Sequence, residues 1–241
     1  MCGKALRFSE EMIKLTQRKI ETSVLLFEGG WNMLYEYLTK NYRENEPILL
    51  SDIQIEGMSD GNLRQQIKKL SDDGRIKRYD AGIYFIPKKS IFQSGTQLSL
   101  NDVIRYKYLQ DETGLCGYVS GLEFANQLGI TTQVPMKKEI VTNKATKDYR
   151  ETTLARSSII IRKSRIRVTQ DNYKALQLLD LLKDIDVLAE VTGEMLSKKL
   201  ISYMKSTALT FDDIDLYLDY YPEKIYKNLY KVGLLNGVFT S

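Results

Sequence analysis

Apolar residues recur at helical spacing over the first 42 residues of the chain. This spacing predicts one helix over residues 8–27 and a second over residues 31–42, with Gly29 and Gly30 between them. The apolar run at residues 48–50 predicts either a short strand or the lead-in to a small helix over residues 51–55.

A third predicted helix combines one apolar face with one polar face. Ser59 is a favourable N-cap for it, and Gly74 is a favourable residue for ending it. The residues between them that fall at core-facing spacing are Leu63, Ile67 and Leu70.

Two β-type runs follow this helix, over residues 75–79 and 83–86. Asp80-Ala81-Gly82 between them is typical of a hairpin turn. The predicted order is a helix, a short helix, a third helix and a hairpin within about 60 residues. This is the order of elements in a winged helix-turn-helix. We therefore expect a DNA-binding unit centred on residues 51–87.

The polar side of the third helix carries side chains of the types that can read DNA. Gln65 and Lys68 should point outward, where Gln pairs with adenine and Lys reaches guanine or phosphate. Ser59 leaves free N–H groups that can meet a phosphate at the helix start. Arg75, Lys77 and Arg78 are expected on the first strand of a basic wing, with Tyr79 at its tip. The full set of candidates here is Ser59, Asn62, Arg64, Gln65, Lys68, Lys69, Arg75, Lys77, Arg78 and Tyr79.

The same pattern has a second interpretation. Residues 51–89 hold eight basic and six acidic residues, a local charge of only +2. A solvated amphipathic helix with an ordinary hairpin, or a winged helix used as a protein-interaction adaptor, is compatible with that charge.

The Gly/Ser/Gln-rich stretch at residues 93–97 predicts a linker between two domains, residues 1–92 and 98–241. The predicted fold class is α+β, with an N-terminal winged-helix domain and a C-terminal α/β domain that ends in a helical bundle. The elements expected in the second domain are strands at residues 140–142 and 158–162 and helices at residues 99–109, 120–128, 172–182, 190–204, 211–218 and 223–232.

A basic segment lies in the middle of the chain. Residues 137–167 hold ten basic against three acidic residues, whereas residues 168–241 hold eight against eleven. Strand alternation would place Lys163, Arg165 and Arg167 on one side, where they could form a phosphate-binding stripe, and Arg162 belongs to the same basic cluster. A solvated sheet face whose charges limit edge aggregation is the alternative.

Composition argues against catalysis. The chain of 241 residues contains no histidine and only two cysteines, which excludes histidine-based catalysis and common zinc sites. Cys116 is expected to be a small buried residue, and the low cysteine count fits a reducing cytoplasm. An acidic cluster near the C-terminus is compatible with a carboxylate-metal nuclease, but a solvated helix face explains it better. The cluster consists of Asp212, Asp213, Asp215 and Asp219. We expect no catalytic residue, metal, cofactor or membrane span.

One part of the chain resembles the AbiEi-type antitoxins of type IV toxin–antitoxin and abortive-infection systems. Residues 63–70, 74–78 and 82–84 look like that family's recognition helix, basic wing and closing Gly-x-Tyr. One departure is Ala81, where family members often carry Arg before the wing glycine. Ala81 has no charged group with which a wing tip could contact the minor groove.

Two further segments carry the resemblance. Residues 119–135 place Leu-Gly and Thr-Gln-Val-Pro after a helix of small residues, and residues 140–143 and 159–167 follow the family's strand pattern. The likeness covers roughly residues 51–185.

The resemblance implies a function. It is that of an antitoxin and transcriptional repressor of its own operon in phage defence, which neutralises a nucleotidyltransferase-like toxin without a stable complex. A single short helix reads too few bases for useful specificity, so the expected DNA partner is an inverted repeat in the promoter. We expect a monomer in solution, with two copies on DNA.

Overall fold

The computed structural model describes residues 33–88 and 97–235, and it divides the chain into two compact units, residues 1–107 and 108–241. The described residues form both helices and strands, as the α+β prediction requires. The predicted helix at residues 8–27 and most of the predicted linker lie outside them, so the boundary between residues 92 and 98 stays a prediction. Within residues 33–88 and 97–235, no helix is both long and apolar enough to cross a bilayer.

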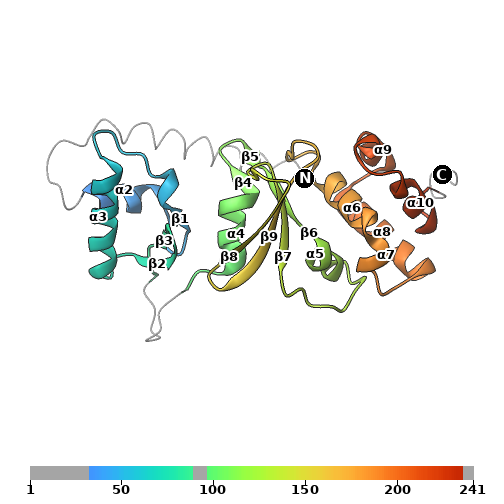
Figure 1. Ribbon diagram of the computed structural model, residues 1–241, viewed down its shortest axis with the longest axis horizontal. Coiled ribbons are helices and arrows are strands. Elements are labelled where there is room, and N and C mark those ends of the chain that lie inside the picture. Colours follow the sequence, from blue (N-terminus) through green and yellow to red (C-terminus); the bar gives the residue numbers. More distant parts are fainter. Residues whose placement is uncertain (1–32, 89–96, 236–241) are drawn as a thin grey trace. The chain divides into compact units, whose positions relative to one another are not determined.

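Unit 1 contains helices, two short helical turns and a small sheet (Figure 1). Its sheet is antiparallel and has the strand order β1-β3-β2. The elements along the chain are α2 (Met33–Asn41), β1 (Ile48–Leu49), the 3-10 turn η2 (Leu50–Asp52), α3 (Asp60–Asp72), β2 (Lys77–Asp80), β3 (Ile83–Phe85) and α4 (Leu100–Ile104). The π-helical turn η3 (Arg105–Leu109) follows and includes the boundary between the two units.

Both ends of α3 are fixed by local hydrogen bonds. The Ser59 hydroxyl accepts a bond from the backbone N–H of Asn62, 3.3 Å away, as an N-cap does. At the other end, the N–H of Arg75 reaches the Leu70 carbonyl at 3.0 Å, and that of Gly74 reaches Ser71 at 3.1 Å. Gly74 adopts a φ of 71°, the left-handed conformation that this Schellman motif needs.

The core of unit 1 explains which face of α3 is buried. Leu63, Ile67 and Leu70 all pack in one cluster with Leu34 and Leu38 of α2, as the apolar spacing predicts. Because these three residues occupy one side of the helix, the opposite side of α3 is left to solvent.

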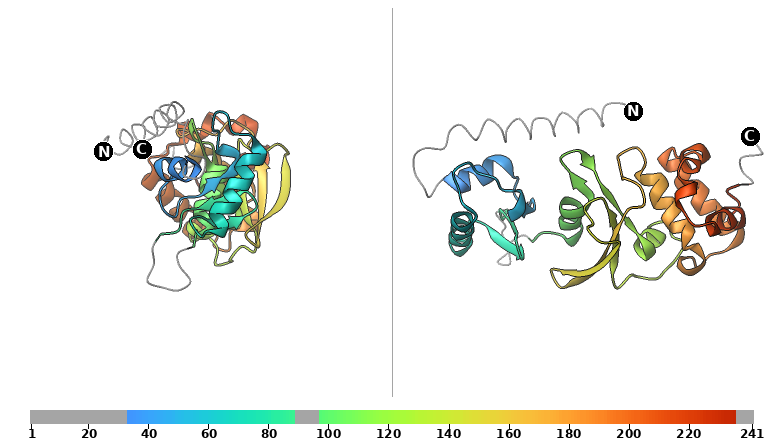
Figure 2. Two further views of the ribbon diagram at one scale, coloured as in Figure 1. Left: turned by 90° about the vertical axis from the view of Figure 1, so that its left-hand side faces the viewer. Right: turned by 45° about the horizontal axis from the view of Figure 1, so that its top comes forward.

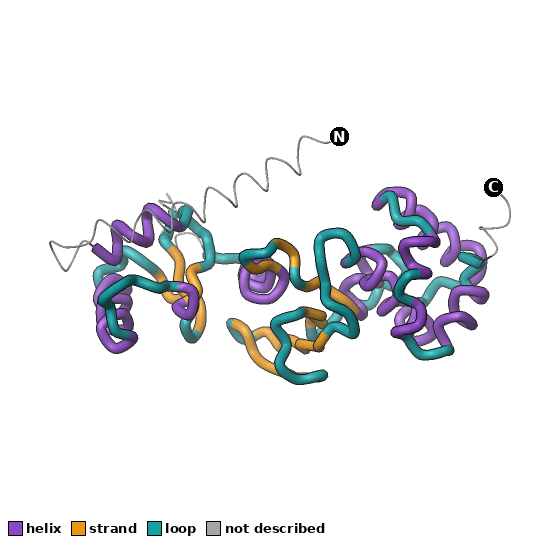
Figure 3. Tube along the Cα trace, turned by 90° about the horizontal axis from the view of Figure 1, so that it is seen from above, coloured by secondary structure: helices purple, strands orange, loops and turns teal. Residues whose placement is uncertain are grey.

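Unit 2 combines a four-stranded sheet, a two-stranded ribbon and a set of helices that follows them (Figure 3). Its strands are β4 (Gln110–Asp111), β5 (Gly114–Leu115), β6 (Gly117–Ser120), β7 (Lys138–Thr142), β8 (Tyr149–Leu154) and β9 (Ser157–Lys163). Its helical elements are α5 (Gly121–Gln127), α6 (Tyr173–Lys183), α7 (Ile185–Leu188), α8 (Gly193–Thr207), α9 (Phe211–Asp215), the 3-10 turn η4 (Leu218–Tyr220) and α10 (Lys224–Lys231).

The large sheet has the order β6-β7-β9-β8, and the long β8–β9 hairpin appears yellow in Figure 2. Strand β7 pairs with β9 in parallel, whereas the other two pairings are antiparallel. The carboxyl ends of β7 and β9 therefore meet at one edge of the sheet. Ala155 and Arg156 make the tight hairpin turn with φ values of 45° and 71°.

Helix α6 lies at the centre of the second core. It packs against β6 on one side and against α9 and α10 on others, and it is buried from Ala175 to Lys183. A polar stripe runs along this buried helix. Gln177 donates to the Val119 carbonyl at 2.7 Å, and Asp180 accepts a bond from the Tyr118 hydroxyl at 2.8 Å.

Candidate nucleic-acid interface

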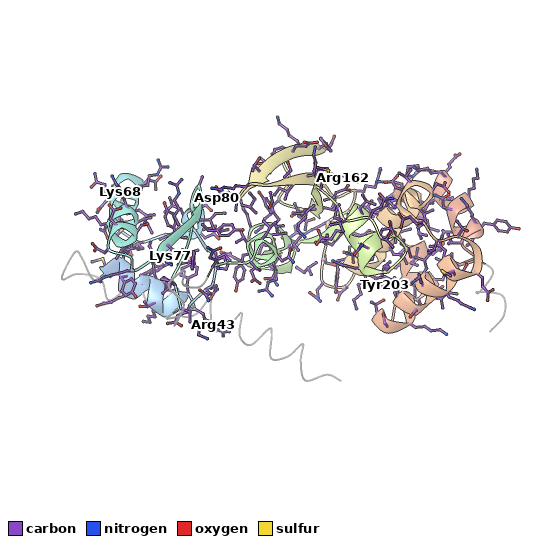
Figure 4. The ribbon with its side chains drawn as sticks, turned by 90° about the horizontal axis from the view of Figure 1, so that it is seen from below. Arg43, Lys68, Lys77, Asp80, Arg162 and Tyr203 are labelled. Carbon is purple, nitrogen blue, oxygen red and sulfur yellow. The ribbon has the colours of Figure 1, made fainter. Side chains whose placement is uncertain are left out.

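The exposed face of α3 carries the predicted DNA-reading side chains. Arg64, Gln65 and Lys68 are all exposed, and no other described residue makes a hydrogen bond or ion pair with their side chains. Gln65 and Lys68 lie opposite the buried face, and Lys68 is labelled in Figure 4. The middle of the helix thus presents an amide and two cations to solvent, the groups that bind base edges and phosphates.

The flanking positions of α3 are partly engaged. Asn62 accepts a hydrogen bond from the Gln66 amide at 3.2 Å, and its own amide N–H groups have no partner among the described residues. Lys69 is exposed and has an interaction within the protein. The Ser59 hydroxyl is used as the cap, so any contribution of this residue to DNA comes through nearby backbone N–H groups.

Carboxylates surround the start of α3. A hollow of about 430 Å³ beside the first turn is lined partly by Glu56 and Asp60. Asp72 and the C-cap Asp73 lie at the other end of the helix. Carboxylates therefore lie at both ends of α3, whereas the cations Arg64 and Lys68 lie in its central part.

The hairpin differs from the predicted wing in detail. Tyr79 is not at the tip: it occupies a bulge within β2, and Ala81-Gly82 forms the turn. Lys77 lies opposite the buried Phe85, whereas Arg78 lies opposite the partly exposed Tyr84. Because opposed residues share a face, Lys77 and Arg78 point to opposite sides of the hairpin.

Arg75 precedes β2 and is not part of the strand, which corrects the prediction. Gly74 and Arg75 are used to terminate α3, so β2 starts only at Lys77. The Arg75 guanidinium lies 5.2 Å from the centroid of the Tyr35 ring, a cation–π contact within unit 1. Arg78 is exposed, and its Nε atom donates to the carbonyl of Asp80 at 3.3 Å.

The predicted stripe of Arg162, Lys163, Arg165 and Arg167 does not exist as a strand face. Strand β9 ends at Lys163, and the next residues leave the sheet. The reason is Asn143, whose side chain bonds both the N–H and the carbonyl of Val168 at 2.8 Å and so pins the departing loop. Arg165 and Arg167 therefore lie on that loop.

Arg162 is engaged inside unit 2. Its guanidinium is half-buried and forms an ion pair with Glu139 of the neighbouring strand. Burial alone would lower the pKa of Arg162, but the negative charges of Glu139 and Asp180 outweigh it and raise that pKa. Arg162 remains charged, but its charge is largely compensated. Arg165 stacks over Tyr221 at 5.4 Å and donates to the Tyr220 carbonyl at 3.5 Å.

Sequence reasoning missed the polar residues that lie beside these cations. A pocket of unit 2 is lined by Asp148, Arg162, Lys163, Ser164, Arg165 and Asp180. A signal was present in the sequence, since Asp180 interrupts the otherwise apolar run of the helix at residues 178–182.

All four carboxylates of the acidic cluster are exposed, and one of them has a structural role. Asp213 closes a capping box with Thr210 at the start of α9, and these hydrogen bonds lower the pKa of its carboxyl group. No group of three or more acidic or cysteine side chains in residues 33–88 and 97–235 could hold a metal ion. Cys116 is 1% exposed, which confirms the expectation of a small buried residue.

Comparison with models of protein families and with curated protein sequences gave no match.

Proposed function

We propose that unit 1 is a winged helix-turn-helix that binds double-stranded DNA, with α3 as its recognition helix in the major groove. The order α2, β1, η2, α3 and the β2–β3 hairpin supports this, with η2 as a shortened second helix. The observation that carries the proposal is the exposed face of α3. It is held rigidly at both ends and presents Arg64, Gln65 and Lys68 without partners among the described residues.

Gel retardation of a duplex from the region upstream of the gene, with specific and random competitor DNA, tests this proposal. Lys68→Gln should weaken binding at least about tenfold, since a charge-assisted hydrogen bond is worth about 1.5–3 kcal/mol. Lys205→Gln is the matched control, because Lys205 is an exposed lysine of unit 2 without a partner among the described residues. Equal affinities for both variants and the parent protein would refute the assignment of α3.

The wider role is that of an antitoxin and autorepressor in a type IV toxin–antitoxin operon, located in the cytoplasm. This rests on the resemblance to the AbiEi-type antitoxins. On this proposal, the DNA is a promoter inverted repeat bound by two copies, and the toxin is a nucleotidyltransferase-like enzyme that forms no stable complex with the protein.

Co-expression with a nucleotidyltransferase-like gene from the same operon tests the wider role. The parent protein should restore growth and repress a promoter reporter. Lys68→Gln should lose repression and keep protection, if unit 1 acts only on DNA. Failure of the parent protein to protect cells would exclude the antitoxin role and leave DNA binding intact as a separate result.

One observation favours a second candidate, an adaptor that binds proteins through α3. The helix and its C-cap carry three basic residues and three acidic residues, so their formal charge is zero. A protein surface accommodates mixed charges, whereas DNA repels Asp60, Asp72 and Asp73. Under this alternative the protein would show only weak DNA binding, with the same affinity for upstream and random duplexes at low salt.

A further inference from the structure

Unit 2 contains a polar pocket that the proposed DNA contact does not use. It has a volume of about 380 Å³ and lies at the carboxyl end of β9, where β7 also ends. The residues that line it are all of polar or charged types: Asp148, Arg162, Lys163, Ser164, Arg165 and Asp180. Figure 4 marks Arg162 among the side chains of this unit.

The back of the pocket is a preformed network. Asp180 is 5% exposed and accepts a hydrogen bond from the Tyr118 hydroxyl. The ion pair with Glu139 holds Arg162 from the neighbouring strand. These two pocket residues therefore already have partners within the protein, and they form a fixed wall.

The remaining groups are available at the mouth. Lys163 is exposed, and no described carboxylate lies within ion-pair distance of it. Arg165 is oriented by the Tyr221 ring and the Tyr220 carbonyl, and it also lacks a carboxylate partner among the described residues. Ser164 lies between the two in the chain and adds a hydroxyl group.

One acceptor accompanies these donors. The backbone of Asp148 is fixed, because its carbonyl accepts the N–H of Lys163 at 3.3 Å. Its carboxylate is exposed and has no partner among the described residues. The open part of the pocket thus offers two cations and a hydroxyl for an anion, and one carboxylate for a hydrogen-bond donor.

From this arrangement we propose that the pocket binds a small molecule that carries one phosphate monoester and a hydroxyl or amino group. Lys163, Arg165 and Ser164 hold the phosphate, and Asp148 accepts a hydrogen bond from the donor group. Nucleoside 5′-monophosphates have this chemistry, and the volume falls within the roughly 300–1,000 Å³ typical of small-molecule sites.

A DNA backbone fits the pocket less well. Asp148 and the deeply buried Asp180 both line it, and they repel a polyanion that has no donor to offer them. A compact ligand with a terminal phosphate avoids this repulsion, because its phosphate stays at the cationic mouth while its donor meets Asp148.

Isothermal titration calorimetry on the full chain tests the proposal. The probes are inorganic phosphate, the 5′-monophosphates of adenosine, guanosine, cytidine and uridine, unphosphorylated adenosine, and a short blunt duplex DNA. We expect at least one monophosphate to bind with a Kd below about 1 mM, more tightly than inorganic phosphate, while adenosine does not bind.

Variants locate the binding. Lys163→Gln and Arg165→Gln should each weaken the monophosphate about tenfold or more, whereas Lys205→Gln should leave it unchanged. Asp148→Asn should weaken the nucleotide but not inorganic phosphate, because only the nucleotide can place a ribose hydroxyl or base amino group against Asp148 while its phosphate is held by Lys163 and Arg165. Thermal melting of each variant shows whether the fold is kept.

Three results would overturn the proposal. One is the absence of heat with every phosphate-bearing probe, and another is binding that Lys163→Gln and Arg165→Gln leave intact. The third is duplex binding that depends on Lys163 and Arg165 while monophosphates do not compete, which would assign the pocket to DNA.

Discussion

Gly74 offers a direct test of how α3 is terminated. Its φ is 71°, and a Cβ atom built there would meet no other atom within 4 Å. The cost of Gly74→Ala is therefore the left-handed backbone alone, about 1–2 kcal/mol for an L-residue. Alanine also restricts the unfolded chain more than glycine does, which offsets about 0.4–1 kcal/mol of this backbone cost. We expect unit 1 to be destabilised by roughly 1 kcal/mol.

Gly61 is the matched control, because it also has open space around its Cβ position but lies in α3 with an ordinary φ. Gly61→Ala should stabilise unit 1 by about 0.4–1 kcal/mol. Urea unfolding of the full chain, followed by the amide NMR signals of Ile67 and Leu70, reports on unit 1 alone. If the two substitutions shift the midpoint in the same direction, the account of the α3 C-terminus is wrong.

Three further predictions concern other contacts. Tyr118→Phe should destabilise unit 2 by about 1–3 kcal/mol in urea unfolding, because the Asp180 carboxylate loses its donor, whereas Tyr230→Phe at an exposed position should have no effect. Arg78→Gln should reduce the slope of log affinity for DNA against log salt by about 1, and an unchanged slope would exclude a phosphate contact. Cys116→Ser should keep DNA binding under reducing conditions, and loss of binding by a folded variant would contradict the purely structural role of this thiol.

Local signals made α3 predictable. Ser59, Gly74 and the spacing of Leu63, Ile67 and Leu70 each act within a few residues, and the structure confirms all of them. Where a helix was expected over residues 51–55 there is only the 3-10 turn η2, whose first residue, Leu50, donates its N–H to the Gly82 carbonyl of the hairpin. That contact joins residues far apart in sequence, so local spacing does not reveal it.

Of the four strands in the large sheet of unit 2, only β7 and β9 were predicted. Strand β8, Tyr149–Leu154, was missed because it is an edge strand whose residues are mostly exposed and polar, so it lacks an apolar alternation. The prediction that a basic stripe continues past Lys163 was wrong. Asn143, which is far away in sequence, hydrogen-bonds the backbone of Val168 and holds that segment in a loop. The pocket residues could not be grouped, because Asp148, Arg162 and Asp180 meet only through strand pairing and the packing of α6.

The central claim is that α3 reads DNA sequence. Fluorescence anisotropy with a duplex from the upstream region and a shuffled duplex of the same composition measures this directly. The account predicts that the parent protein prefers the upstream duplex and that Gln65→Ala lowers this preference by about 1–3 kcal/mol, while Gln170→Ala, at an exposed position of unit 2, does not. Equal affinity of the parent protein for both duplexes, or an unchanged preference in Gln65→Ala, would contradict it.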